Sequence, residues 1–427
     1  MNTIKYPATK EWVKLVQRPI VEQDKLFALV NQIFAEIQKN GNKAVLKYSS
    51  FFDKTKTKNI EVDAKQIANS KRNIPKKLQT AIHIAKNNIE VFHATQQEKK
   101  QVVETTKGVK CWRENRAIEK VGIYIPGGSA PLFSTVLMLG VPAKLAGCKE
   151  IILCTPPAEN GSINPAILFT ANLVGITKIF VVGGIQAIGA MTFGTETIPR
   201  VDKIFGPGNQ YVTIAKQVAQ NFGVAIDLPA GPSEVLIIAD DCAKPKFIAA
   251  DLLSQAEHGN DSQVILLSNN EAIIEQTMLE INVQIKKLPR ENIAEKVLKN
   301  SKAILLNSID ECVEFSNSYA PEHLIMAVKN YEKYIDNICN AGSVFLGNYS
   351  CESAGDYASG TNHTLPTNGY ARNYSGVSLD SFIKKITFQE LSKEGIKNIG
   401  TAIETMAEAE HLIAHKNAVT IRLNETI

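Results

Sequence analysis

The chain has 427 residues, of which 44% are hydrophobic and 21% are charged, and its formal net charge at pH 7 is +4. This length allows two or three domains with a large buried core, and the composition is typical of a soluble globular protein. The small net charge argues against nucleic-acid binding, and the longest apolar runs have the length of strands, which argues against a membrane span.

The N-terminus lacks the charged-then-apolar pattern of a secretory signal, so we expect a cytoplasmic protein. Seven cysteines are scattered through the chain without a CxxC pair. This argues against a disulfide framework and against a structural zinc site built from cysteines. We also expect no covalent catalysis by cysteine, because neither Cys111 nor Cys154 has a visible activating partner.

The first hundred residues differ from the rest of the chain in their pattern of apolar and polar residues. Residues 1–20 are polar and contain proline, which predicts an arm rather than a domain. From residue 22 to about 100, apolar residues recur at three- and four-residue spacing, which predicts amphipathic helices. The lysines concentrated between Lys54 and Lys110 are interpreted as solvated faces of this helical tract.

From residue 119 onward, predicted strands and helices alternate. In the middle of the chain we expect strands at 121–125, 150–154, 178–182 and 202–205, with helices at 132–145, 165–173, 185–193 and 211–222. A second series has strands at 234–239, 263–267, 303–306, 323–328 and 343–346, with helices at 245–258, 271–287, 293–298 and 311–319. Such alternation predicts right-handed βαβ units around mostly parallel sheets.

The sequence therefore predicts an α/β fold with two Rossmann-like halves, joined at a hinge near residues 230–233. The tail leaves this alternation. We expect β or irregular structure at 382–391, a helix at 393–415 and a short strand at 419–423. A helical tail after a finished sheet is either an arm for a partner subunit or a segment packed on its own domain.

Gln255 and His258 lie near the end of the predicted helix 245–258 and share one helical face. An amide oxygen beside an imidazole makes half of a metal site. The alternative is that His258 caps the helix or lies in the core, and the pair alone does not decide between them.

Glycine-rich turns follow three predicted strands, at 126–129, 183–184 and 206–209, and none fits the G-x-G-x-x-G fingerprint of dinucleotide binding. One interpretation is three tight turns. The other is a nucleotide groove lined by Tyr124, Gln186 and Asn209, because ligands of open α/β sheets bind at the carboxyl ends of strands. Spacing alone weighs the two evenly.

Three further segments carry groups suited to chemistry. Glu322 and His323 lie side by side at a predicted strand start, where they can divide acid–base work, although a surface Glu beside a half-buried His is the plainer interpretation. The polar segment 352–363 reads as a functional loop with Asp356 and His363. His411 and His415 have the spacing of a two-histidine metal face, or of polar residues at a helix end.

Together these segments resemble the histidinol dehydrogenases, the zinc- and NAD-dependent enzymes of the last steps of histidine synthesis. The resemblance spans residues 22–423 and is loosest over 54–110. It is carried by the segments Tyr124–Met138, Gly206–Asn209, Pro229–Leu236, Asp251–Gly259, Tyr319–His323, 356–366 and Ala414–Val419.

The resemblance implies oxidation of L-histidinol, through L-histidinaldehyde, to L-histidine with reduction of two NAD+. It implies one zinc ion per subunit, held by Gln255, His258, Asp356 and, from the second subunit of a homodimer, His415. His411 then drops out as a ligand. Glu322 and His323 become the catalytic acid–base pair. Tyr124, Gln186 and Asn209 fall at NAD-contacting positions, and the substrate-binding positions are Ser233, Gln255, His258, His323, Asp356, Glu410 and His415.

The resemblance also implies an aldehyde dehydrogenase-like arrangement of domains. Residues 1–21 would form an N-terminal arm, 22–120 with 233–377 a first α/β domain, 121–232 an NAD-binding α/β domain, and 378–427 a dimerisation tail. Two rival functions are a metal-dependent hydrolase with Glu322 as its base, and a metal- or imidazole-binding protein without turnover. The three glycine turns argue against the first, and the presence of both Glu322 and His323 argues against the second.

Overall fold

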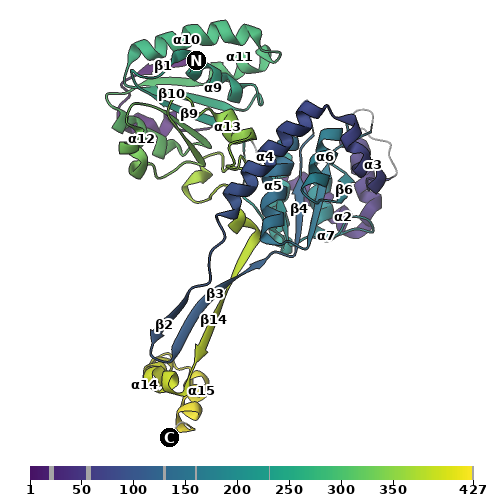
Figure 1. Cartoon of the computed structure of the whole chain (residues 1–427), viewed down its shortest axis with the longest axis vertical. Coiled ribbons are helices and arrows are strands. Elements are labelled where there is room, and N and C mark those ends of the chain that lie inside the picture. Colours follow the sequence, from purple (N-terminus) through teal and green to yellow (C-terminus); the bar gives the residue numbers. More distant parts are fainter. Residues whose placement is uncertain (19–23, 54–58, 128–130, 159–160, 230, 426–427) are drawn as a thin grey trace.

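The computed structural model describes residues 1–18, 24–53, 59–127, 131–158, 161–229 and 231–425. Two separate sheets, each flanked by helices, lie side by side, and a long ribbon extends away from them to a pair of helices near the C-terminus (Figure 1). No helix in the described ranges is long and apolar enough to cross a membrane. Ser129 and Ala230, which belong to the predicted first glycine turn and the predicted hinge, lie outside the described residues.

The five-stranded sheet comes from the middle of the chain and is parallel, with strand order β6-β5-β4-β7-β8. Its strands are β4 (Lys120–Tyr124), β5 (Glu150–Thr155), β6 (Lys178–Val181), β7 (Lys203–Phe205) and β8 (Ala225–Ile226). Its helices are α5 (Phe133–Ala146), α6 (Pro165–Leu173), α7 (Gly184–Phe193) and α8 (Gln210–Ala219). The strand order reverses between β4 and β7, which is where ligands bind in open α/β sheets.

The helical N-terminal tract packs on this same sheet. It contains α2 (Asp24–Phe52), α3 (Ala64–Asn69) and α4 (Lys76–Ala94). Apolar side chains of α2, such as Phe34, share a core with Ile152 and Ile188, and Ile89 of α4 shares one with Val136. The packing therefore differs from the predicted grouping of residues 22–120 with 233–377, because the apolar faces of α2 and α4 cover the other sheet.

The six-stranded sheet is also parallel, with strand order β1-β11-β10-β9-β12-β13. Its strands are β1 (Asn2–Lys5), β9 (Glu234–Ala239), β10 (Gln263–Ser268), β11 (Lys302–Leu305), β12 (His323–Ala327) and β13 (Ser343–Leu346). Its helices are α9 (Pro245–Ala256), α10 (Glu271–Gln284), α11 (Glu291–Asn300), α12 (Ile309–Tyr319) and α13 (Glu352–Tyr357). Residues of β9, β10 and β12 are buried throughout, as expected for the centre of a parallel sheet.

The N-terminal residues are part of this sheet rather than an arm. Strand β1 pairs with β11 at one edge, and α1 (Thr9–Leu15) inserts Trp12 into the core, where its ring lies 5.3 Å from that of Phe315. The prediction of an arm was wrong here because the pairing partner of β1 lies about 300 residues away and leaves no local signal.

The ribbon is an antiparallel sheet of order β14-β3-β2, and it carries the last two helices at its far end (Figure 1). We call this unit the protrusion; it consists of β2 (Val102–Thr106), β3 (Val109–Ala117), β14 (Ile383–Leu391), α14 (Lys393–Ala409) and α15 (Ile413–Asn424). The interpretation of the lysines up to Lys110 as faces of helices was wrong beyond residue 100, where the chain forms β2 and β3. Strand β3 is held by β14, which is remote in sequence.

The predicted strand at 419–423 was also wrong, since these residues lie in α15. Their β-branched residues favour a strand, but Leu423 packs against Gly400 of α14, and a Cβ at Gly400 would lie 2.9 Å from Leu423 Cδ1. Tertiary packing against α14 therefore outweighs local propensity. Short 3-10 turns occupy Ser70–Asn73, Gln220–Phe222, Ile285–Lys287, Tyr331–Asn337, Tyr370–Arg372 and Leu379–Phe382.

Candidate active site

A cavity lies where the carboxyl ends of β4 and β7 meet the amino ends of β9 and β12. Its wall includes Gly206 and Asn209 from the five-stranded sheet and Ser233, His258 and Glu322 from the six-stranded sheet. The structure thus brings a predicted nucleotide turn and predicted metal, substrate and acid–base positions to one cavity.

Glu322 and His323 lie at the mouth of a strand, as their sequence context predicted. Helix α12 ends at Tyr319 and is capped by Ala320, whose φ of 55° turns the chain, and His323 is the first residue of β12. Both side chains are buried, and Glu322 Oε2 lies 3.6 Å from His323 Nδ1.

The two side chains bond to the backbone of one residue, Glu234. Its N–H donates to Glu322 Oε2 at 2.8 Å, and its carbonyl oxygen lies 3.1 Å from His323 Nδ1. A carbonyl oxygen only accepts, so Nδ1 carries the proton in the neutral ring. His323 Nε2 is buried without a hydrogen-bond partner, and Asp356 Oδ1 lies 3.5 Å from it.

Burial and neighbouring charges shift both groups in this pair. Burial raises the pKa of Glu322 to about 8, although the nearby His323 acts to lower it. Burial acts to lower the pKa of His323, but the carboxylates of Glu322, Glu352 and Asp356 outweigh it and raise that pKa to about 10. A cation bound beside these carboxylates would offset their charge and lower the pKa of His323. Strongly shifted pKa values of this kind are typical of catalytic groups.

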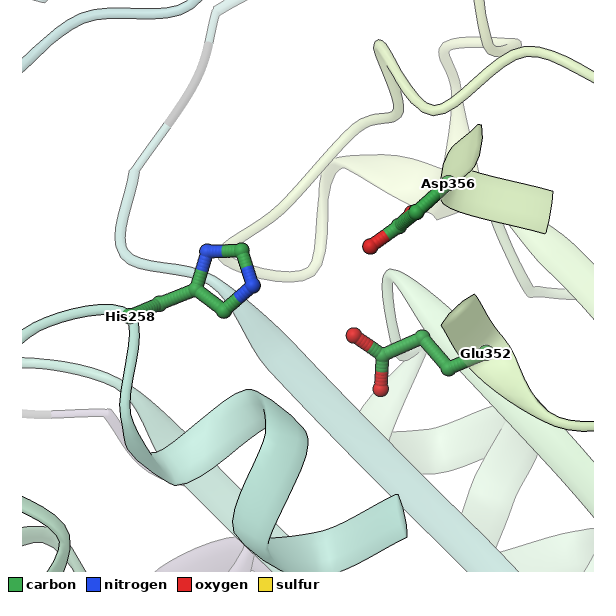
Figure 2. Close-up of side chains that lie close together, drawn as sticks. All are labelled: His258, Glu352 and Asp356. Carbon is green, nitrogen blue, oxygen red and sulfur yellow. The ribbon is translucent and has the colours of Figure 1, made fainter. Parts of the chain in front are cut away.

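His258, Glu352 and Asp356 form a cluster of potential metal ligands, with donor atoms within 4.8 Å of one another. Figure 2 shows the His258 ring facing the two carboxylates. Glu352 and Asp356 are four residues apart on α13, so they share one helical face. The prediction of a loop over 352–363 was therefore wrong for its first six residues.

Gln255 lies beside this cluster, on the last turn of α9, and is fully buried. With its amide oriented to satisfy its hydrogen bonds, the nitrogen donates to both carboxylate oxygens of Glu352, and the oxygen accepts from the N–H of Glu234 at 3.0 Å. One imidazole, two carboxylates and an amide are a mixed nitrogen and oxygen donor set that fits a divalent cation such as Zn2+.

Glu352 is the member of this group that the sequence analysis missed. It follows Cys351 at the start of a segment interpreted as a polar loop, where a carboxylate is common without a functional role. The four-residue spacing between Glu352 and Asp356 was the available signal.

Glu410 and His415 do not reach this cluster within one chain. They lie at the far end of the protrusion (Figure 1), Glu410 as the capping residue after α14 and His415 on α15, and both are exposed. His411 has a φ of 58° between the two helices. The expected single helix over 393–415 was thus wrong, because the chain turns at residues 410–412.

The predicted NAD-contacting positions all lie at the carboxyl edge of the five-stranded sheet. The Tyr124 hydroxyl accepts a hydrogen bond from Gly184 N at 3.1 Å, and Gln186 Nε2 donates to Asp53 Oδ2 at 3.0 Å. Tyr124 and Gln186 are buried, whereas Asn209 is exposed and caps α8. Asp53, which follows α2, is a further polar neighbour that the sequence analysis missed.

The Gly206 turn requires glycine. Its φ is 125°, and a Cβ there would lie 2.0 Å from the carbonyl oxygen of Tyr124. Two side chains hold the backbone of this turn: Gly206 N donates to Asp227 Oδ2 at 2.8 Å, and Gly206 O accepts from Lys216 Nζ at 2.8 Å. Lys216 and Asp227 themselves form a buried ion pair. The backbone at this turn is therefore fixed where it lines the cavity.

Comparison with known proteins places this architecture in a family. A family model described as histidinol dehydrogenase matches residues 16–423. A histidinol dehydrogenase of Bacteroides thetaiotaomicron is 58% identical over 424 residues, covering 99% of each chain. The crystal structure of histidinol dehydrogenase from Elizabethkingia anophelis has a TM-score of 0.98 at 63% identity, covering 100% of this chain and 98% of that one.

A more distant likeness shows the fold alone. An acetylating aldehyde dehydrogenase from Geobacillus thermoglucosidasius has a TM-score of 0.50 at 15% identity, covering 85% of this chain and 96% of that one. The predicted α/β fold with parallel-sheet cores in an aldehyde dehydrogenase-like arrangement is confirmed.

Proposed function

The chain belongs to the histidinol dehydrogenase family, and on that premise we propose that it oxidises L-histidinol, through L-histidinaldehyde, to L-histidine while reducing two NAD+. The observation that carries this proposal is the shared cavity, whose wall includes Glu322, His258 and the Gly206 turn of the other sheet. His323 lies directly behind this wall, with its Nδ1 3.6 Å from Glu322 Oε2. The cavity thus joins an acid–base residue and a potential metal ligand to a glycine turn at the carboxyl end of a strand, where ligands of open α/β sheets bind.

His323 is the proposed base for the substrate hydroxyl. In the neutral ring Nε2 is the unprotonated nitrogen, because Nδ1 donates to the carbonyl oxygen of Glu234, and Nε2 has no hydrogen-bond partner. In each oxidation, the proton of the substrate hydroxyl passes to Nε2, and the carbon that bears this hydroxyl transfers a hydride to NAD+. The neighbouring carboxylates raise the pKa of His323, so the ring is available to accept the proton once a bound cation offsets their charge.

Glu322 is the proposed base for the water that hydrates the aldehyde. Its carboxyl group lines the cavity and accepts from the N–H of Glu234. The ionised form that acts as the base predominates above its pKa of about 8. Hydration adds water across the carbonyl, and the proton lost by that water passes to Glu322. The hydrate then has the hydroxyl that the second oxidation requires.

Zinc is the proposed resident metal, held by Gln255, His258 and Asp356 together with His415 of the partner subunit. The donor set supports this, since nitrogen and oxygen ligands suit Zn2+ and the substrate offers imidazole and amino nitrogens for an open position. When bound, the ion supplies a positively charged template that orients those nitrogens. Glu352 holds the Gln255 amide, and Asp356 faces His258 across the cluster.

A homodimer with shared sites is the proposed assembly. The protrusion exposes several large apolar side chains, which is unusual for a surface that faces only water. On α14, α15 and the turn between them, these are Met406 at 66%, Ile421 at 62%, Ile413 at 51% and Leu412 at 43% exposure. A second copy that covers them would bring Glu410 and His415 to its own cavity, where Glu410 would hold the substrate imidazole.

NADH formation tests the function. Zinc-loaded protein is mixed with L-histidinol and NAD+, absorbance of NADH is followed, and histidine is measured by chromatography. We expect two NADH for each histidine formed. Folded, zinc-loaded protein that yields no NADH would refute the dehydrogenase proposal, and NADH without histidine would refute the second oxidation.

A further inference from the structure

We propose that the buried ion pair between Arg18 and Glu234 is a positioning device for the Glu322–His323 pair. This inference rests on the proposed function, in which these two residues carry protons. Neither Arg18 nor the Glu234 side chain lines the cavity, so the ion pair acts through other residues rather than on the substrate.

The ion pair is bidentate and almost fully shielded from water. Arg18 Nε lies 2.7 Å from Glu234 Oε1, and Arg18 Nη2 lies 2.8 Å from Oε2. The side chains are 12% and 1% exposed. The guanidinium carbon lies 3.7 Å from the centroid of the Tyr319 ring, which adds a cation–π contact. Two parallel N–H···O bonds fix a carboxylate in direction as well as in place.

A second donor holds the same carboxylate. The N–H of Asn368 donates to Glu234 Oε1 at 3.1 Å. The Glu234 side chain is therefore held both by the segment before α2 and by the chain that follows the metal-donor helix α13. These two segments meet only through the tertiary fold.

The backbone of Glu234 is what touches the acid–base pair. Its N–H donates to Glu322 Oε2, and its carbonyl oxygen accepts from His323 Nδ1. The first bond orients the proposed water-activating carboxylate. The second fixes the tautomer of His323 and leaves Nε2 as the basic nitrogen. One peptide residue thus sets the geometry of both groups.

The strand ladder alone does not hold Glu234 on this side. In the register of β9 with β12, His323 pairs with Val235, so the ladder begins one residue after Glu234. On the opposite side, Glu234 is paired with Gln263 of β10. The side-chain contacts to Arg18 and Asn368 supply the fixation that the β12 side of the ladder lacks.

Arg18 also contacts the chain that leads into the pair. Its Nη2 lies 3.4 Å from the carbonyl oxygen of Ala320, and its guanidinium covers Tyr319. Ala320 turns the backbone in the left-handed region two residues before Glu322. A single guanidinium therefore connects the start of β9 with the turn before β12, the two segments that must keep register for the Glu234 bonds to form.

If the ion pair were only structural, its removal would have a different effect on the kinetics. Its loss would lower stability and reduce all functions in proportion to the folded fraction. Loss of a positioning device lowers kcat in the protein that remains folded, while zinc content and the KM values for histidinol and NAD+ stay near wild type. The split between kcat and KM therefore separates the two roles.

Two variants avoid leaving an unpaired buried charge. Arg18→Lys keeps the positive charge but loses the planar fork, and the double variant Arg18→Met with Glu234→Gln removes both charges together. Trp12→Phe is the matched control, because Trp12 lies in the same N-terminal segment and packs on Phe315 without touching Glu234. Steady-state kinetics, zinc per subunit and circular dichroism are measured for each folded protein.

We expect both Arg18 variants to lower kcat by about 10- to 100-fold, with KM values and zinc content within about threefold of wild type. Trp12→Phe should lower the melting temperature and keep kcat within about twofold. The proposal is overturned if Arg18→Lys and the double variant keep wild-type kcat, if kcat falls only with zinc content, or if neither variant accumulates as folded protein. Absence of turnover in wild type would instead refute the proposed function.

Discussion

The amino edge of the six-stranded sheet and the tip of the protrusion carry the two parts of the proposed site, and they differ in almost every physical respect. At the sheet edge, Glu322, His323 and Glu352 are buried and their partners come from the same chain. At the tip, Glu410 and His415 are exposed beside apolar side chains such as Met406.

This difference shows which part of the site one chain completes. Burying several carboxylates and an imidazole together costs free energy, and proteins retain such clusters chiefly at functional sites. An exposed apolar helix pair at the end of a ribbon gains stability only when another surface covers it. The sheet edge is thus formed within the chain, whereas the tip acquires its role only in the proposed dimer.

The largest expected effect on a reaction rate comes from substitution of Glu322, at the amino edge of the six-stranded sheet. Glu322→Gln keeps the shape of the side chain but removes the base that activates water. We expect the second oxidation to slow by about 10²- to 10⁴-fold and the first to slow much less, with zinc retained. Separate rates with histidinol and with histidinaldehyde measure this, and equal slowing of both steps would contradict the water-activating role.

A second test asks whether the tip serves another chain. His258→Asn should lower zinc content and activity together, by more than about 100-fold. Loss of a direct metal ligand should weaken zinc binding at least as much as loss of a residue that hydrogen-bonds to a ligand. His415→Asn should do the same if the partner supplies that ligand. The exposed His83, on α4, provides a control as His83→Asn, which should change neither quantity.

Coexpression of the His258 and His415 variants then separates the two arrangements. Each mixed dimer would have one intact site and one doubly altered site, and half of the dimers would be mixed, so about a quarter of wild-type activity should return. Activity that stays at the level of the single variants would show that the sites are not shared.

A smaller effect on zinc binding is expected from substitution of Glu352, whose place in the cluster of potential metal ligands is seen only in the structure. Glu352→Gln removes the charged acceptor for the Gln255 amide. Loss of such a support should weaken zinc binding by about 10- to 100-fold, measured by competition with a chelator. Asp251→Asn is the control, because Asp251 is also partly buried on α9 but is not among the clustered metal donors. Unchanged zinc affinity in Glu352→Gln would rule out this role.

The mildest change is expected from substitutions at the tip of the protrusion, which should alter assembly without altering the fold. Met406→Asp and Ile421→Asp place charges on exposed apolar positions and should weaken the dimer while leaving the two sheets folded. Light scattering coupled to size exclusion measures the mass, and circular dichroism measures the fold. Val13→Asp, at an equally exposed apolar position on α1, should not change the mass. A dimer that survives both changes at the tip would mean that another surface holds it.

Local pattern predicted the two parallel sheets well for a physical reason. Central strands of such sheets are buried on both faces, so β9 appears as an uninterrupted apolar run that ends at polar residues. The edge strands β1 and β2 and the strand β3 lack this signature, because each is exposed on at least one face. In addition, β1 and β3 pair with partners that are distant in sequence.

For the candidate site, sequence supplied the residue types and their short spacings. Gln255 with His258, and Glu322 with His323, were recognisable because their partners are within three residues. Asp53 was not, because its importance depends on a contact with Gln186 that no spacing encodes. For Glu352 the only local signal was its four-residue spacing to Asp356, and its contact with Gln255 depends on the tertiary fold.

By itself, the sequence determined the α/β class, the order of most strands and helices along the chain, and the family to which it belongs, because these follow from local apolar periodicity and from contiguous motifs. Only the tertiary structure decided that the N-terminal segment enters a sheet, that Arg18 holds Glu234 behind the acid–base pair, and that Glu410 and His415 lie on a remote protrusion. Those facts depend on contacts between residues hundreds of positions apart, which the free energy of the whole fold selects.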